Sequence, residues 1–192
     1  MKKSYNNLSS SLIAKKLSNS LVAVALLTVF ILSSVKVEAS EINGSNVLRI
    51  INTEREGNHL KPLLIDPDLE RAATLKSRDM INRNYFEHYA FGLTPWDFIK
   101  NSGYDFSLAG ENLAMDFATS EGMVNAWMNS PAHRANILNP DFQDIGIGIV
   151  KGAYKENGVS NETTMVANLF GSKKSKFEIY LDNILKRIIN LF

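Results

Sequence analysis

Apolar residues recur at helical spacing between residues 46 and 103, in three separate segments. Such a period is typical of amphipathic helices that bury one face. The segment boundaries carry residues that favour helix ends, because aspartate or threonine followed by proline favours a start and glycine favours an end. These boundary residues are Gly57 after the first segment, Asp66 and Pro67 before the second (which runs to about Asn82), and Thr94, Pro95 and Gly103 around the third.

The second half of the chain begins with helical signals and then changes period. Ser120 opens a fourth predicted helix, and Ser130-Pro131 opens a short fifth one. Over residues 145–149, isoleucine alternates with glycine, which predicts a strand with one apolar face and one bare face that another backbone can approach closely. Asn157-Gly158 signals a turn before a returning strand over 164–170. Helices followed by a hairpin indicate an α+β domain.

The first 39 residues have the pattern of a signal peptide. Lysines precede an uncharged apolar run of 12 residues, Leu21–Leu32, and Val37-Glu38-Ala39 places small residues where a signal peptidase cleaves. A membrane span needs roughly 20 apolar residues, so cleavage after Ala39 is favoured over an uncleaved anchor. We therefore expect a signal peptide over 1–39, a short segment over 40–45, one domain over 46–171 and a helical tail over 172–192.

Removal of residues 1–39 changes the net charge from +1 to −3, because this segment carries five lysines and one glutamate. A mildly acidic protein exerts no long-range attraction on phosphate backbones, so the sequence argues against a nucleic-acid partner. The chain has no cysteine, which excludes disulfides, a thiolate nucleophile, cysteine-bound zinc and lipoprotein acylation. The hydrophobic core alone must therefore hold the fold together.

The tail over 172–192 carries an apolar stripe at i, i+3, i+4 and i+7 spacing, which predicts an amphipathic helix. The stripe consists of Phe177, Tyr180, Leu181, Ile184, Leu185, Ile188, Leu191 and Phe192. Packing of this stripe onto the domain is the favoured interpretation, with self-association or contact with a membrane surface as alternatives. Asp182, Lys186 and Arg187 argue against a transmembrane span, so none is expected in the mature chain.

Four short motifs stand out between about Val47 and Gly171. They are Tyr85-Phe86-Glu87-His88, Gly110-Glu111-Asn112-Leu113-Ala114, the run from Ala126 to Leu138, and the alternation over 145–149. In this order they resemble the signature of the CAP superfamily (cysteine-rich secretory, antigen 5 and pathogenesis-related class 1 proteins, the SCP domain), specifically its cysteine-free bacterial branch. The resemblance implies a three-layer α-β-α sandwich around a small antiparallel sheet, with residues 112–115 on a further strand.

The resemblance also implies a central cleft in which His88, Glu111 and His133 meet. In the family, two histidines and two glutamates occupy this cleft, and the histidines of several members bind a divalent metal. The second glutamate has no counterpart here, because Ser130 stands at its position. The resemblance therefore implies a metal site of His88 and His133, with zinc as the foremost metal, and Glu111, Ser130 and Asn112 as further cleft residues.

The residue types suit this chemistry, whereas their spacing alone does not establish it. Neutral imidazole is a common zinc ligand, and a carboxylate can ligate the metal or orient a histidine. Two histidines and one carboxylate would leave a coordination position open for water, as in catalytic zinc sites. His88 and His133, however, lie 45 residues apart and form no His-Glu-x-x-His motif. Without the resemblance, unrelated surface or core histidines would be the favoured interpretation.

Several of these residues also have a purely structural interpretation. Glu111 and Asn112 could tie down backbone N–H groups of a loop, and for Glu111 this role and ligand contact weigh equally. Ser130 precedes a proline and is favoured as a helix N-cap whose oxygen accepts from the backbone, over a hydrolase pair with His133. No Gly-x-Ser-x-Gly elbow supports a hydrolase. His59 matches no cleft position and is expected to face solvent.

The sequence favours an exported, non-enzymatic binding module whose cleft takes a divalent metal or a small ligand. A metal-dependent, peptidase-like hydrolase that uses His88, His133 and Glu111 is the first alternative, and a structural protein of the cell surface is the second. The expected location is outside the cytoplasm, either secreted and extracellular or periplasmic in a host with an outer membrane. The expected partner is an extracytoplasmic protein, a lipid or a small ligand.

Overall fold

The computed structural model describes residues 42–189, so the predicted signal peptide and its cleavage point lie outside the described residues. Four strands form one sheet in the order β1-β3-β4-β2. The strands are β1 (Leu64–Ile65), β2 (Phe106–Met115), β3 (Asp144–Glu156) and β4 (Val159–Lys173). β4 pairs antiparallel with both β2 and β3, whereas the two-residue β1 pairs parallel with β3.

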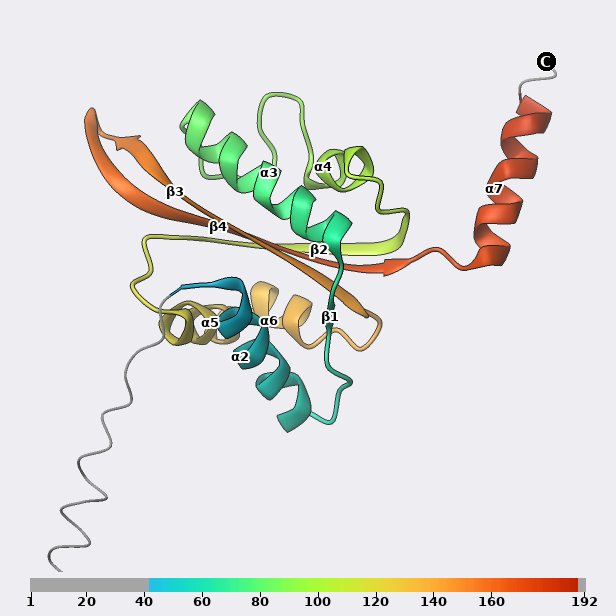
Figure 1. The fold of residues 1–192 in the computed structure, drawn as a ribbon, viewed down its shortest axis with the longest axis horizontal. Coiled ribbons are helices and arrows are strands. Elements are labelled where there is room, and N and C mark those ends of the chain that lie inside the picture. The colour runs from blue at the N-terminus through green and yellow to red at the C-terminus, as the bar shows by residue number, and fades with distance from the viewer. Residues whose placement is uncertain (1–41, 190–192) are drawn as a thin grey trace, which may run out of the picture. The chain divides into compact units, whose positions relative to one another are not determined.

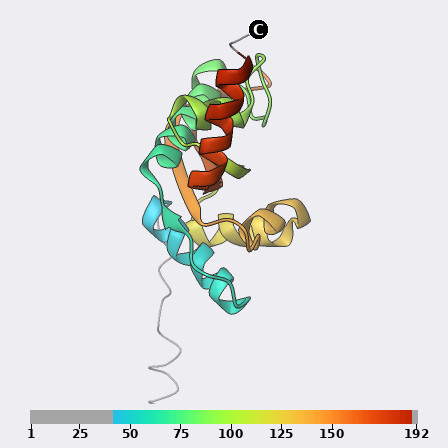
Figure 2. The same cartoon turned by 90° about the vertical axis from the view of Figure 1, so that its right-hand side faces the viewer.

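Helices cover both faces of this sheet (Figures 1 and 2). One face carries α3 (Pro67–Arg83) and α4 (Pro95–Asn101), and the other carries α2 (Gly44–Gly57), α5 (Ser120–Asn129) and α6 (Pro131–Ile137). Each face buries its own apolar core, one around α3 and one around α2 and α5. The predicted α+β class and three-layer α-β-α sandwich are therefore confirmed.

The helix starts follow from local capping chemistry. The Asp66 carboxylate accepts hydrogen bonds from the backbone N–H groups of Asp68 and Leu69, at 2.9 and 3.2 Å, and so opens α3 as predicted. Thr94 and Asp97 form a reciprocal capping box at the start of α4. α2 begins at Gly44, two residues before the predicted start at 46, because the side chain of Asn43 caps it.

The bare face of β3 is the surface on which α3 packs. A Cβ atom added to Gly146 would lie 2.1 Å from the backbone carbonyl carbon of Leu69, and one added to Gly148 would lie 2.1 Å from that of Ala73. No side chain fits between strand and helix at these points, because real Cβ contacts are never this short. The predicted close approach is confirmed, and it fixes the position of α3 on the sheet.

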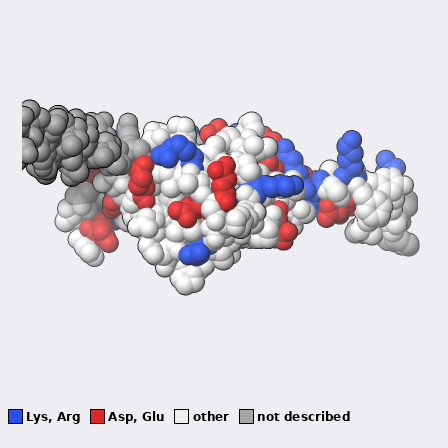
Figure 3. Space-filling view, turned by 90° about the horizontal axis from the view of Figure 1, so that it is seen from below, with Lys and Arg blue, Asp and Glu red and all other residues white. Residues whose placement is uncertain are grey.

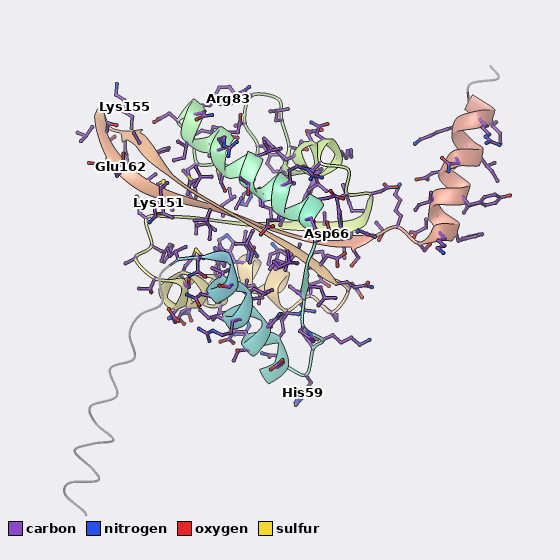
Figure 4. The ribbon with its side chains drawn as sticks, viewed as in Figure 1. His59, Asp66, Arg83, Lys151, Lys155 and Glu162 are labelled. Carbon is purple, nitrogen blue, oxygen red and sulfur yellow. The ribbon has the colours of Figure 1, made fainter. Side chains whose placement is uncertain are left out.

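The β3–β4 hairpin is longer than the sequence predicted. Asn157 and Gly158 both adopt positive φ values, 50° and 84°, and form the predicted two-residue turn. The returning strand starts directly after this turn, at Val159, and not at residue 164. Figure 4 shows Lys155 and Glu162 near the end of the hairpin. The two strands there are largely exposed, so they lacked the apolar pattern by which a buried strand is recognised.

The tail forms the predicted amphipathic helix, α7 (Lys176–Ile189), which follows β4 after a two-residue connection. The expected packing of its apolar stripe against the domain is not observed. Phe177 and Tyr180 remain 67% and 60% exposed, and Leu181 remains 41% exposed. Figure 1 shows α7 beyond the end of β4, away from the helices that cover the sheet. Over residues 42–189, no helix is both long and apolar enough to cross a bilayer.

Candidate ligand cleft

A cleft of about 380 Å³ opens beside β2, the edge strand of the sheet. It is lined by His88, Tyr89, Pro95, Trp96, Ala109, Gly110, Glu111, Ala132, His133 and Asn136. These residues come from the segment between α3 and α4, from the start of α4, from β2 and from α6, so both helical layers contribute to the cleft. The cleft can form because an edge strand has no neighbouring strand to separate the two layers. The structure thus places three predicted residues, His88, Glu111 and His133, around one cavity.

His88 and Glu111 form a direct pair. The Nδ1 atom of His88 lies 2.6 Å from Oε1 of Glu111. The Glu111 side chain is only 2% exposed, whereas the His88 side chain is 46% exposed. An ionised carboxylate can only accept, so Nδ1 carries the proton, and in the neutral ring Nε2 is then the nitrogen with the lone pair. Glu111 therefore orients the His88 ring from the protein side, which is the arrangement expected of a histidine that binds a ligand through Nε2.

The electrostatics of Glu111 reflect competing effects. Burial raises the pKa of the Glu111 carboxyl, while the hydrogen bond from His88 and the positive charge of Lys76 act in the opposite direction. The other carboxyl oxygen, Oε2, is buried, and the described residues offer it no hydrogen-bond partner. A buried acceptor without a partner is uncommon and is typical of a site that takes a water, an ion or a ligand.

Lys76 holds the backbone of the His88 segment in place through hydrogen bonds from α3. Its Nζ donates to the backbone carbonyls of Glu87 and His88, at 2.8 and 3.0 Å, and to the Tyr85 hydroxyl at 3.3 Å. Lys76 is 1% exposed, and its burial lowers its pKa. Sequence reasoning missed this residue. A signal for it existed, because Lys76 occupies a core-facing position of α3, three residues after Ala73 and four before Met80.

His133 is positioned by two asparagines. Asn112 donates through Nδ2 to the His133 carbonyl at 3.1 Å, and Asn136 donates to the Glu111 carbonyl and to Oδ1 of Asn112, at 3.0 and 2.8 Å. Burial lowers the pKa of His133, and the nearby His88 lowers it further. His133 therefore favours the neutral form, which has a lone pair for a metal. Asn112 itself is fully buried and acts as a structural link between β2 and α6.

The C-terminal end of the helix that carries His133 is also bound to α2 of the same layer. The Arg55 guanidinium, buried on α2, donates from Nη1 to the carbonyls of Ile137 and Asn139, both at 2.8 Å. Gly110 permits the close contact of β2 with Phe142 and Asn136, because a Cβ added to Gly110 would lie 2.8 Å from the Phe142 ring and 3.0 Å from Oδ1 of Asn136. The glycine of the Gly-Glu-Asn motif thus has a packing reason.

Two other predicted residues lie apart from this cleft. Ser130 directly precedes α6, but its side chain makes no capping hydrogen bond, so that part of the N-cap expectation is wrong. The backbone carbonyl of Ser130 accepts instead from the Arg134 N–H at 2.8 Å, and Ser130 is not a lining residue of the cleft. His59 is exposed as expected, at the end of α2 (Figure 4).

The described residues contain no group of three or more His, Cys, Asp or Glu side chains that could hold a metal ion. Of the cleft residues, His88 and His133 are the ones that would hold a metal, with Glu111 paired to His88 through Oε1. The donor chemistry fits such an ion, because one imidazole has its lone pair directed by a carboxylate and the other favours its neutral form.

Comparison with known proteins agrees with this architecture. Residues 48–169 match the CAP family, the cysteine-rich secretory protein family. The chain belongs to this family. YkwD of Bacillus subtilis (strain 168) is 47% identical over 107 residues, which are 55% of this chain and 41% of YkwD.

Two solved structures are similar as well. One is an extracellular protein containing an SCP domain from Bacillus anthracis str. Ames, with a TM-score of 0.58 and 28% identity over 67% of this chain and 40% of that one. The other is an outer surface protein from Borrelia burgdorferi, with a TM-score of 0.55 and 28% identity over 71% of this chain and 99% of that one. The chain thus spans less than half the length of the two Bacillus relatives.

Proposed function

We propose that this protein is an extracytoplasmic binding module whose cleft takes a divalent metal, zinc foremost, through His88 and His133. The pair between His88 Nδ1 and Glu111 Oε1 at 2.6 Å carries the proposal, because it directs the His88 lone pair away from the buried carboxylate. Location outside the cytoplasm is supported by the predicted signal peptide and by relatives described as extracellular and outer-surface proteins.

The parts of the cleft have separate roles in this proposal. His88 and His133 bind the metal, Glu111 orients His88, Lys76 holds the backbone of the His88 segment, and Asn112 with Asn136 holds α6. When bound, zinc would act as a Lewis acid with coordination positions left for water or a ligand. Tyr89 and Trp96 form aromatic walls at which a small ligand or a partner side chain can rest.

Zinc binding tests the proposal directly. In a chain that begins at Ser40, zinc should raise the melting temperature, because a ligand that binds only the folded state stabilises it. His88→Ala and His133→Ala should each remove most of the shift, and the double variant should lose little more, since both lose the same site. His59→Ala is the matched control and should keep the full shift. A shift that survives both cleft variants would show that the zinc binds elsewhere.

Glu111→Gln separates an orienting role from a catalytic one. Glutamine keeps the shape of the side chain but weakens the hold on His88, and we expect zinc affinity to fall about tenfold, the lower end of the range for loss of an orienting partner. A metal-dependent hydrolase is the second candidate, because Glu111 has a raised pKa and an unpartnered oxygen. Zinc-dependent turnover of peptides or esters that is lost in Glu111→Gln would favour that candidate over the binding module.

The proposed location has its own test. Protein recovered from outside the producing cell should begin at Ser40, because Val37-Glu38-Ala39 is the predicted cleavage signal. Mass analysis of the N-terminus would measure this. Recovery of only the full-length chain, in the membrane fraction, would replace the exported form with an anchored one.

A further inference from the structure

α7 presents an apolar stripe that no other described element covers. Along an ideal helix, Phe177, Leu181, Ile184 and Ile188 fall on one line, with Tyr180 and Leu185 on either side of it. The side chains of this stripe are exposed, apart from that of the partly buried Ile184. Ile179 lies on the opposite side of the helix and is 39% exposed. On an ideal helix the stripe spans about 140° of the circumference.

Hydrogen bonds and an ion pair define the start of α7 next to the end of the sheet. Ser175 and Glu178 form a capping box, with the Glu178 N–H donating to Ser175 Oγ at 3.2 Å and the Ser175 N–H donating to Glu178 Oε2 at 2.7 Å. The Lys174 N–H donates to the Asp105 carbonyl at 3.0 Å, and the Lys174 ammonium pairs with Asp182. The capping box sets where α7 begins, and the Lys174–Asp105 hydrogen bond joins the two-residue connection to the domain, while the stripe itself stays exposed.

The charge of the tail is opposite to that of the domain. Residues 172–192 contain five basic and two acidic residues, a net charge of +3, whereas residues 40–171 contain 11 basic and 17 acidic residues, a net charge of −6. In Figure 3 the tail, at the right, shows a largely white surface, with blue atoms along its upper edge and both blue and red atoms at its base. An anionic surface would therefore attract the tail and repel the domain, and so would orient the molecule with α7 toward the surface.

We propose that α7 docks on the surface of an anionic lipid bilayer, with its stripe in the headgroup region and the domain held above. A broad apolar stripe, a tyrosine at its edge and nearby Lys176 and Arg187 are features of helices that lie in a membrane interface. As far as the structure describes it, α7 is too short and carries too many charges for a span. These 14 described residues make two heptads, fewer than a coiled coil with a second copy needs, and the stripe is wider than a coiled-coil seam.

Vesicle binding with one pair of matched variants tests this docking. The described residues 42–189 lie within one compact unit, so the chain from Ser40 is used for every sample. It should bind vesicles that contain phosphatidylglycerol and bind vesicles of phosphatidylcholine alone at least about tenfold more weakly, since each basic side chain near an anionic surface adds roughly fivefold. Binding should fall sharply at about 1 M salt, where the Debye length is about 3 Å.

Leu181→Gln and Ile179→Gln form the matched pair, because both residues are about equally exposed on opposite sides of α7. Leu181→Gln should weaken vesicle binding about tenfold, in line with the burial of one leucine side chain, and Ile179→Gln should change it less than about twofold. Neither should alter the melting temperature.

Three results would overturn the docking on lipid: no binding to anionic vesicles, equal binding to neutral ones, or equal effects of the two variants. Analytical sedimentation tests the alternative that a second copy of this chain covers the stripe. A concentration-dependent dimer that Leu181→Gln dissociates, without vesicle binding, would assign the stripe to a second copy of this chain.

Discussion

The central strand β3 and the edge strand β2 meet their neighbours in opposite ways. β3 offers Gly146 and Gly148 to α3, and helix backbone fills the space where side chains would stand. β2 offers Glu111 to the α3–α4 layer and Asn112 to α6, and both contacts are polar. The first is a close approach of helix backbone to strand that fixes a distance, whereas the second consists of hydrogen bonds at the border of an open cleft.

This difference shows where in the fold a polar ligand-binding site can form. At Gly146 and Gly148, β3 pairs with β4 and its glycine face lies against the α3 backbone, so a buried polar group there would need partners within a closely packed interface. At the edge strand one side opens to the cleft, and Glu111 can keep one oxygen without a protein partner. The two regions are nevertheless connected, because the α3 helix that rests on the β3 glycines also carries Lys76 to the cleft.

Gly148→Ala should have the largest effect on stability. The added methyl group would meet the Ala73 backbone, so α3 must shift, and we expect a loss of about 3 kcal/mol or more in the free energy of unfolding. Gly57→Ala is the matched control, because nothing lies within 4 Å of its added Cβ and helical alanine is favoured by about 0.4–1 kcal/mol. Urea unfolding measures both. Equal effects would mean that the glycines do not set the helix position.

Lys76→Met should have the second largest effect. Methionine keeps most of the volume but leaves the carbonyls of Glu87 and His88 without their donor, a loss of about 1–3 kcal/mol. Zinc affinity should fall with it, because the His88 segment loses its support. Arg78→Met, on the exposed side of the same helix, should change stability by less than about 0.5 kcal/mol. Unchanged zinc affinity in a destabilised Lys76→Met protein would show that Lys76 serves the fold alone.

Local chemistry made much of the fold predictable from the sequence. The caps at Asp66 and Thr94 act within three residues, and the turn at Asn157-Gly158 depends on two residues that tolerate positive φ. The close approach at the glycines of β3 was predictable, because their alternation with isoleucine leaves one face of the strand without side chains. The two-residue β1 was missed, since Leu64 and Ile65 are too few to form a pattern and acquire strand geometry only by pairing with β3.

The candidate site was harder to predict from the sequence, because its contacts join distant parts of the chain. The His88–Glu111 contact was reached through resemblance to a family, and no spacing rule supplies it. Lys76 was missed because a lysine within an apolar stripe is most often placed at the surface, and its acceptors are backbone carbonyls without a sequence signature. The expected packing of α7 failed for a related reason: amphipathicity shows that a helix has an apolar face but not what covers it.

The protonation of Glu111 should have the smallest effect on stability of the three changes, and it tests the polar contact of β2 alone. Burial raises its pKa in the folded state above the value of about 4.3 found in unfolded chains. The protonated carboxyl therefore stabilises the fold, fully below the unfolded pKa, and this contribution is lost as the pH rises through the folded pKa. Glu111→Gln removes the titration, so the stability of wild type relative to this variant should decrease from about pH 4 to pH 7 in metal-free buffer.

Urea unfolding at several pH values measures this difference, with a chelator present so that metal binding does not contribute. Glu162→Gln, on the exposed hairpin, controls for the loss of one negative charge from the chain. Its difference from wild type should show no comparable decrease. If the difference for Glu111 instead grew with pH, the hydrogen bond from His88 and the charge of Lys76 would outweigh burial. The polar edge at β2 would then stabilise the fold at neutral pH, as the glycine contact at β3 does, and the contrast between the two strands would be one of geometry alone.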